Sequence, residues 1–304
     1  MGEESAILRV TEFTDPGCVW SWSSEPTLRW LRRRYGAQIR WERVYGIQVD
    51  DLARTHPGKD PVCDAEAFRA DWLAVAAHTG APVTERLEWM HASTRPACAA
   101  ALAAEDQGDA VAEPVLRRLR EAVFVTGRPA DTPERIADAV AGVAGLDVAA
   151  LLERAASPAV AAALDDHWAR TRDPLPDVID RTGPGPNPGA AKADGEHLRY
   201  GFPTLVAEGP RGRRVLSGWR APQAFAAELE TLAGPALRPD ARPWPVADAL
   251  AHHRSLTAAE LLVLTGVEDP GPDAVRIDTA TAPLWLHPEE AAARGLPAVV
   301  GARR

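Results

Sequence analysis

The chain has 304 residues, of which 46% are hydrophobic and 25% are charged, an ordinary composition for a globular protein. Its formal net charge of −9 argues against a nucleic-acid-binding surface and against attraction to anionic membranes. No apolar run reaches the roughly 18–20 residues that span a bilayer, and the N-terminus has no signal-peptide pattern. The three cysteines, at positions 18, 63 and 98, make no disulfide framework, so we expect a cytoplasmic protein.

The N-terminal part of the chain predicts a strand, a helix and a second strand. Residues 6–13, AILRVTEF, combine alternating and β-branched residues, as strands do. Residues 18–35 predict a helix with an apolar stripe, bent by Pro26 and closed by a glycine. Residues 37–46 predict the next strand. This order implies two parallel strands joined by a right-handed crossover.

The middle of the chain changes character. From about residue 65 to residue 172 the pattern is helical almost throughout. Thr132 and Ser157 mark two helix starts, because each is a hydroxyl at an N-cap position followed by a proline. Residues 173–197 are rich in Pro and Gly and lack periodicity. They predict a disordered or merely tolerated insertion or, alternatively, a functional lid.

The remaining residues return to short alternating elements. FPTLVAEG and RRVLSG, between Phe202 and Gly218, predict a β-hairpin, and the following APQAFAAELETLAG predicts an amphipathic helix. Residues 235–245 form a Pro-rich linker. The end of the chain predicts two short helices and two short strands near Val275 and Leu284, compatible with a small winged-helix-like appendage.

Two motifs together resemble a known family. DPGCVWSWSSEP (15–26) matches, except at Ser21, the pattern D-P-x-C-x-W-C-W-x-x-E-P of the cytoplasmic FrnE-like and YjbH-like branch of the DsbA family. YGFPTLVAEG (200–209) is similar to the cis-proline strand of that family. The resemblance covers residues 6–233. It implies an α/β protein with a thioredoxin fold, an all-helical insertion and a small C-terminal α+β extension.

The element order and the resemblance set the expected domain limits. We expect residues 1–62 and 198–234 to form the thioredoxin-like domain. Residues 63–197 are the expected helical insertion, which ends in the Pro/Gly-rich loop. Residues 235–304 are the expected linker and small appendage.

Cys18 is the candidate nucleophile. At the amino end of a helix, unpaired backbone N–H groups and the positive end of the dipole stabilise a thiolate, so we expect the pKa of Cys18 to lie below that of a free thiol. Asp15 acts in the opposite direction if its carboxylate is close. A buried core cysteine is the alternative interpretation.

Ser21 stands where a dithiol site has its second cysteine. A hydroxyl cannot resolve a mixed disulfide, but it can donate a hydrogen bond that stabilises the thiolate. A CxxS site therefore needs an external thiol as resolver, and glutathione or mycothiol is the expected co-substrate. Two alternatives stay open. Cys63 or Cys98 acts as resolver, although Cys98 has the helical spacing of a core residue, or Ser21 is an engineered substitution.

The resemblance implies further site residues. Pro203 is expected to be cis and to present the backbone of Phe202 to a peptide or a small thiol, with Thr204 beside it. Trp20 is expected to line a hydrophobic substrate groove. Arg95 begins an insertion helix that faces the active site in this family, so it is expected to bind a carboxylate. A solvated arginine is the alternative for Arg95.

These features predict a DsbA-like thiol oxidoreductase or transferase that works through one nucleophilic cysteine and an external low-molecular-weight thiol. The expected partners are that thiol and a small-molecule or protein substrate, with no tightly bound cofactor, no metal, no nucleic acid and no membrane; a homodimer is left open. One alternative is an enzyme like glutathione transferase kappa or 2-hydroxychromene-2-carboxylate isomerase. Another is a non-catalytic protein-binding adaptor.

Overall fold

The computed structural model describes residues 6–183 and 185–296. The chain divides into two compact units, one within residues 1–46 and 165–242 and the other within residues 47–164 and 243–304. Helix α9 (Pro158–Thr171) continues from the second unit into the first. The domain limits expected from the sequence stay a prediction.

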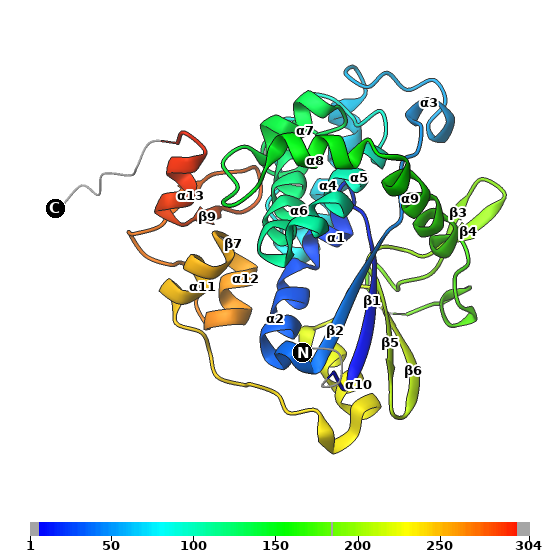
Figure 1. The fold of residues 1–304 in the computed structure, drawn as a ribbon, viewed down its shortest axis with the longest axis vertical. Coiled ribbons are helices and arrows are strands. Elements are labelled where there is room, and N and C mark those ends of the chain that lie inside the picture. Colours follow the sequence, from blue (N-terminus) through cyan, green and yellow to red (C-terminus); the bar gives the residue numbers. More distant parts are fainter. Residues whose placement is uncertain (1–5, 184, 297–304) are drawn as a thin grey trace. The chain divides into compact units, whose positions relative to one another are not determined.

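The first unit is built on a four-stranded sheet with the order β2-β1-β5-β6 (Figure 1). Strand β1 runs parallel to β2 and antiparallel to β5, and β5 forms an antiparallel hairpin with β6. The predicted parallel pair and the predicted hairpin are therefore confirmed. In chain order the elements are β1 (Leu8–Thr14), α1 (Val19–Ser23), α2 (Glu25–Tyr35), η1 (Gly36–Gln38), β2 (Ile39–Tyr45), η3 (Pro176–Val178), β3 (Lys192–Asp194), β4 (His197–Arg199), β5 (Thr204–Gly209), β6 (Gly212–Ser217), α10 (Pro222–Ala233) and η4 (Gly234–Ala236).

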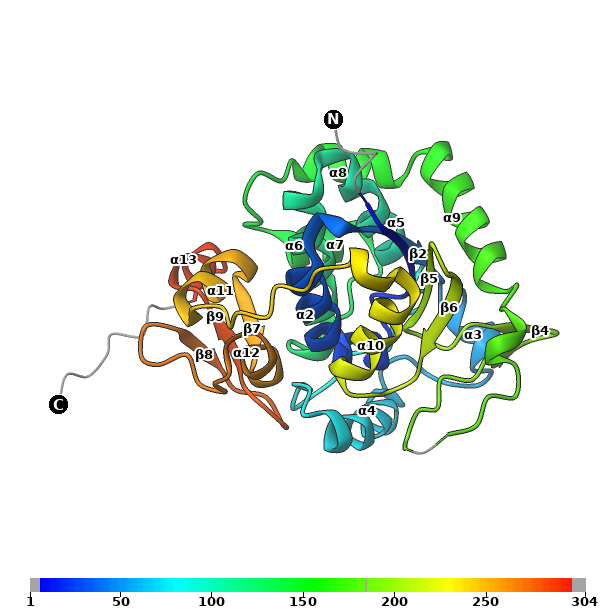
Figure 2. The same ribbon diagram turned by 90° about the horizontal axis from the view of Figure 1, so that it is seen from below.

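Both faces of this sheet carry apolar side chains. On one face, residues of β1, β5 and β6 pack against α2 and α10, which lie side by side (Figure 2). Leu31 and Leu229, one from each helix, are fully buried there. On the other face, Phe13 and Val44 pack with Tyr200. Successive side chains of a strand point to opposite faces, and burial of both gives the sheet its core.

The helix expected over residues 18–35 is two helices. It breaks at Ser24, which is both the C-cap residue of α1 and the N-cap residue of α2. Pro26 lies in the first turn of α2, where its missing N–H would have no partner within the helix. The proline therefore starts a helix at this position, and the predicted bend is a junction between two helices.

The Pro/Gly-rich segment is packed on the first unit in its described part. Val178 is fully buried, and its carbonyl accepts a hydrogen bond of 2.8 Å from the N–H of Ala191. Ser217 donates its hydroxyl to the carbonyl of Gly189 at 2.9 Å, which ties the segment to β6. The expectation of disorder is wrong for these residues, because buried apolar contacts and hydrogen bonds hold them.

The second unit is helical apart from one small sheet, which confirms the all-helical insertion and the α+β extension. The three short strands of the extension form an antiparallel sheet with the order β7-β9-β8. Thr132 accepts a hydrogen bond from Arg135 as the predicted N-cap of α7. The elements are α3 (Leu52–Thr55), α4 (Ala65–Thr79), α5 (Arg95–Ala104), η2 (Glu105–Gln107), α6 (Asp109–Phe124), α7 (Pro133–Val140), α8 (Val148–Ala155), α11 (Val246–His253), β7 (Ser255–Thr257), α12 (Ala258–Thr265), β8 (Val275–Ile277), β9 (Leu284–Leu286) and α13 (Pro288–Ala293).

Strand β7 and helix α13 of the extension were not expected from the sequence. The likeness of this extension to a winged helix stays a prediction. In the part of the chain that the structure describes, no helix has both the length and the apolar character needed to cross a membrane.

Candidate thiol site

Cys18 lies at the start of α1, directly after a tight turn that follows β1. The Asp15 carboxylate accepts the N–H of Gly17 at 2.7 Å, and the Asp15 carbonyl accepts the N–H of Cys18 at 3.2 Å. These two bonds reverse the chain and leave Cys18 in an extended conformation as the N-cap residue. The turn sequence therefore places the thiol at the amino end of a helix.

The sulfur of Cys18 faces the strand that carries Pro203. Its S–H group points at the carbonyl of Phe202, with 3.9 Å between Sγ and the oxygen. The peptide bond between Phe202 and Pro203 is cis. Cys18 is only 5% exposed and packs in one apolar cluster with Phe13, Tyr200 and Phe202. The structure thus brings together three of the residues singled out in the sequence.

Burial raises the pKa of the Cys18 thiol above its ordinary value. The backbone N–H and the hydroxyl of Ser21 act in the opposite direction, as does the positive charge of Arg199, whereas the charge of Asp15 adds to the increase. The expectation of a lowered pKa is therefore wrong. Its physical basis, the helix terminus, is present, but loss of water from a covered sulfur outweighs it.

Ser21 is fully buried beneath the thiol. The hydroxyl of Thr14 donates to the Ser21 oxygen at 3.1 Å. Cys18 makes no side-chain capping hydrogen bond at this helix start. The backbone N–H and the hydroxyl of Ser21 nevertheless lie close enough to the sulfur to lower the pKa of Cys18, because both stabilise the thiolate over the thiol. Thr14, at the end of β1, thus positions Ser21 as a donor toward Cys18.

Arg199 and Gly46 belong to this site but were missed in the sequence. The guanidinium of Arg199 lies 4.8 Å from the centre of the Phe202 ring and donates to the carbonyl of Tyr200 at 2.9 Å. A Cβ atom at Gly46 would lie 2.1 Å from the ring of Phe202, so the ring occupies the space of a side chain. The only available sequence signal was a glycine at the last position of a predicted strand.

A narrow hollow lies next to Pro203. Ser24, Trp219 and Arg220 are among its lining residues. Trp219 also contacts Trp20, with 6.3 Å between the ring centres, so the predicted groove residue lies near this hollow.

The guanidinium of Arg220 packs on an aromatic ring and is not fully hydrogen-bonded among the described residues. It lies 4.7 Å from the centre of the Phe225 ring, and its buried Nε has no hydrogen-bond partner among the described residues. Burial lowers the pKa of Arg220 and the neighbouring Arg181 lowers it further, and the opposing charge of Glu228 does not offset these two effects. Both effects disfavour an isolated positive charge, so a bound carboxylate would stabilise this side chain. The sequence analysis did not single out Arg220.

The other predicted site residues have partners of their own. Arg95 belongs to the second unit, where its Nε donates to Asp50 at 3.1 Å. Thr204 is fully buried and donates to the carbonyl of Gly201 at 2.6 Å, which braces the turn before β5. A role for Arg95 or Thr204 toward substrate stays a prediction.

The other two cysteines differ in exposure. Cys98 is fully buried in α5, which confirms its expected place in the core. Cys63 is exposed, and its hydrogen bond with Asp60 raises the pKa of its thiol. No group of three or more His, Cys, Asp or Glu side chains within residues 6–183 and 185–296 is arranged to hold a metal ion.

Known proteins are similar to this chain in sequence or in fold. A family model described as thioredoxin matches residues 12–173, a little over half of the chain. The ClpXP adapter protein SpxH of Shouchella clausii is 30% identical over 158 residues, which are 52% of this chain and 51% of that protein. The chain thus matches about half the length of this curated relative.

Two solved structures show the same fold. A structure described as a protein disulfide isomerase from Nitrosomonas europaea superposes with a TM-score of 0.55, at 18% identity, and covers 74% of this chain and 96% of its own. The cytosolic disulfide reductase DsbM of Pseudomonas aeruginosa superposes with a TM-score of 0.53, at 21% identity, and covers 73% and 97%. DsbM has also been solved with GSH.

Proposed function

This chain belongs to the thioredoxin family, and we propose that it is a thiol–disulfide oxidoreductase that works through the single thiol of Cys18. One observation carries the proposal. Cys18 stands at a helix start, 3.9 Å from the carbonyl that precedes a cis proline, inside a fold shared with DsbM. A disulfide substrate that pairs with the Phe202 backbone would bring its own sulfur next to Cys18.

The proposed reaction exchanges one disulfide for another. The Cys18 thiol loses its proton to solvent, and the thiolate attacks one sulfur of glutathione disulfide. A bond forms between Cys18 and that sulfur, the original S–S bond breaks, and the second glutathione leaves as a thiolate. Because Ser21 cannot attack the mixed disulfide, a further thiol must release Cys18. That thiol becomes part of a new disulfide, which conserves atoms and electrons.

The raised pKa of Cys18 gives this reaction a required first step. The resting sulfur is covered by the Phe202 carbonyl and by aromatic rings, so the substrate must displace part of this cover before the thiolate reacts. The N–H and hydroxyl of Ser21 and the charge of Arg199 then stabilise the ionised sulfur. These groups supply the electrostatic part of the proposed activation.

We favour glutathione over mycothiol as the external thiol. Glutathione carries two carboxylates, whereas mycothiol carries none, and the Nε of Arg220, beside Pro203, has no hydrogen-bond partner among the described residues. The presence of GSH in a structure of DsbM supports the same choice. We infer a cytoplasmic setting, because all three cysteines are free, as in a reducing compartment.

Intact-mass analysis tests the proposal. The exposed Cys63 would react with any disulfide, so the experiment uses the full-length Cys63→Ala variant as its background. We expect glutathione disulfide at pH 8.5 to add one glutathione to this variant, and we expect Cys18→Ala in the same background to gain none. Adding reduced glutathione should return the original mass.

Two further variants sharpen this test. Arg220→Gln should slow adduct formation with glutathione disulfide but not with the uncharged 2-hydroxyethyl disulfide. Ser21→Cys should release the bound glutathione by forming an internal disulfide. No adduct on native Cys18 with either disulfide would refute the proposed chemistry.

The relation to SpxH favours a second candidate, a ClpXP adapter. An adapter would need to bind protein without using its thiol. The test is sedimentation of the full-length chain with purified ClpXP and its substrates. Binding that persists in Cys18→Ala, together with no glutathione adduct on the native chain, would favour the adapter over the enzyme.

A further inference from the structure

The second unit contains a cavity of about 450 Å³. Its wall is made by Trp89, by residues at the end of α6 and on α7, and by Ile277 and Leu296 from the C-terminal extension. Cavities that hold small molecules have about 300–1,000 Å³ and combine apolar walls with a few polar groups. This cavity therefore has the size of a small-molecule site.

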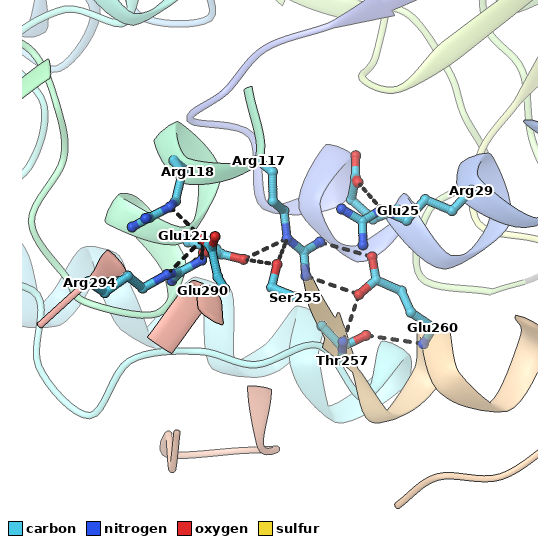
Figure 3. A network of polar contacts seen from close by, with 10 residues as sticks. All are labelled: Glu25, Arg29, Arg117, Arg118, Glu121, Ser255, Thr257, Glu260, Glu290 and Arg294. Carbon is cyan, nitrogen blue, oxygen red and sulfur yellow. Dashed lines mark hydrogen bonds and ion pairs between the residues drawn. The ribbon is translucent and has the colours of Figure 1, made fainter. Parts of the chain in front are cut away.

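Three of the lining residues, Arg118, Glu121 and Arg294, belong to a network of paired charges (Figure 3). Arg294 pairs with Glu121 at 2.7 Å and with Glu290 at 2.8 Å, and Arg118 pairs with Glu290 at 2.9 Å. Arg117 pairs with Glu121 from the other side at 2.7 Å. Each arginine of this network already has a carboxylate, so the network holds the wall in shape.

The lining also contains two arginines beside an aromatic ring. The guanidinium of Arg135 lies 3.9 Å from the centre of the Trp89 ring, and it pairs with Asp131 at 2.6 Å. The guanidinium of Arg128 lies 5.8 Å from the same ring. Arg128 is exposed and has no ion pair among the residues the structure describes, so its charge is available to a ligand.

The charges and the apolar wall define the class of ligand. Arg128 offers one uncommitted cation, whereas Glu121 and Asp138, also in the lining, disfavour a second negative charge on the ligand. Ala122, Ile277 and Leu296 give hydrocarbon surface. We propose that this cavity binds a small monocarboxylate with an apolar or aromatic body, with Arg128 holding the carboxylate and the apolar wall the rest. This site is independent of the thiol chemistry.

Titration of the full-length protein with 2-naphthoate, followed by calorimetry, tests the proposal. We expect one saturable site, with weaker binding of the uncharged 2-naphthamide. Arg128→Gln should raise the Kd for 2-naphthoate at least about tenfold, because it removes a charge-assisted hydrogen bond. Ala139→Trp should abolish binding by filling the cavity, which Ala139 lines.

Two matched variants report where the probe binds. Arg213→Gln removes an exposed guanidinium of the first unit, and Arg220→Gln removes the guanidinium beside Pro203; both should leave the Kd unchanged. The proposal is overturned if 2-naphthoate does not bind at millimolar concentration, or if 2-naphthamide binds equally well. It is also overturned if Arg220→Gln weakens binding while Arg128→Gln, with an unchanged melting temperature, does not.

Discussion

Cys18 and Glu121 are both almost completely buried, at 5% and 2% exposure, but their surroundings affect ionisation in opposite ways. Burial raises the pKa of Cys18, and the hydrogen bonds of Ser21 only reduce that increase. Burial also acts to raise the pKa of Glu121, but Arg294, Arg117, the hydroxyl of Ser255 and Arg118 outweigh it and lower the pKa to about 2. Three guanidinium charges beside Glu121 reverse the effect of burial, whereas the neutral donors of Ser21 and the single charge of Arg199 do not reverse it at Cys18.

Removing a charge beside Glu121 is expected to have the largest effect on stability. Arg117 also makes a bidentate pair with Glu260, at 2.9 and 3.0 Å, so Arg117→Met leaves two buried carboxylates without this partner. We expect the free energy of unfolding in urea to fall by about 3–5 kcal/mol. Arg154→Met, which breaks the exposed pair with Asp106, is the control and should cost about 1 kcal/mol or less. Equal losses for both variants would contradict the assigned role of the buried network.

The pH dependence of stability tests the ionisation of Glu121 itself. Its folded-state pKa of about 2 lies below its ordinary value of 4.5. The resulting stability is therefore fully present above pH 4.5 and is lost as the pH falls toward 2. For this group alone we expect a loss of roughly 3 kcal/mol across that window, measured by urea unfolding at a series of pH values. Glu121→Gln should flatten the curve, and a slope unchanged in this variant would assign the acid sensitivity to other carboxylates.

The third prediction concerns the cover of the thiol. Gly46→Ala places a methyl group against the Phe202 ring and should destabilise the protein by about 1–3 kcal/mol through overpacking. It should also speed alkylation of Cys18 at pH 8, because displacement of Phe202 exposes the sulfur. Gly212→Ala is the steric control, since no atom lies within 4 Å of its added Cβ, although its positive φ adds backbone strain. An unchanged alkylation rate in Gly46→Ala would show that Phe202 does not limit access to the thiol.

The smallest effects are expected when a neutral donor or the carboxylate beside Cys18 is replaced. Ser21→Ala removes a group that lowers the pKa of Cys18, and Asp15→Asn removes a charge that raises it. We expect the pH midpoint of Cys18 alkylation, measured by mass spectrometry in the Cys63→Ala background, to rise in the first variant and to fall in the second. Asn at position 15 keeps an acceptor for the N–H of Gly17, so the turn should be retained. Midpoints that do not move would mean that burial alone controls this thiol.

Local sequence was sufficient for the parallel strands and the hairpin of the first unit, but not for the break between α1 and α2. The hydrophobic period, the proline at a helix start and the paired motifs at Cys18 and Pro203 gave the strands, helices and fold. It was not sufficient for the pKa of Cys18, because burial of the sulfur depends on Tyr200 and Phe202, far along the chain. Arg220 and Gly46 were missed for the same reason. Arg220 matters because it lines a hollow together with Pro203, and Gly46 matters because the Phe202 ring packs against it, and both neighbours are distant in the sequence.

The covered sulfur of Cys18 also bears on damage by peroxides. Irreversible conversion of a cysteine to sulfinic or sulfonic acid depends on an accessible thiolate. The pKa values of both Cys18 and Cys63 are raised, but the sulfur of Cys18 is covered whereas Cys63 is exposed to solvent. Under oxidative stress the exposed cysteine would therefore be consumed first, and the thiol beside Phe202 would be preserved until a disulfide opens its cover.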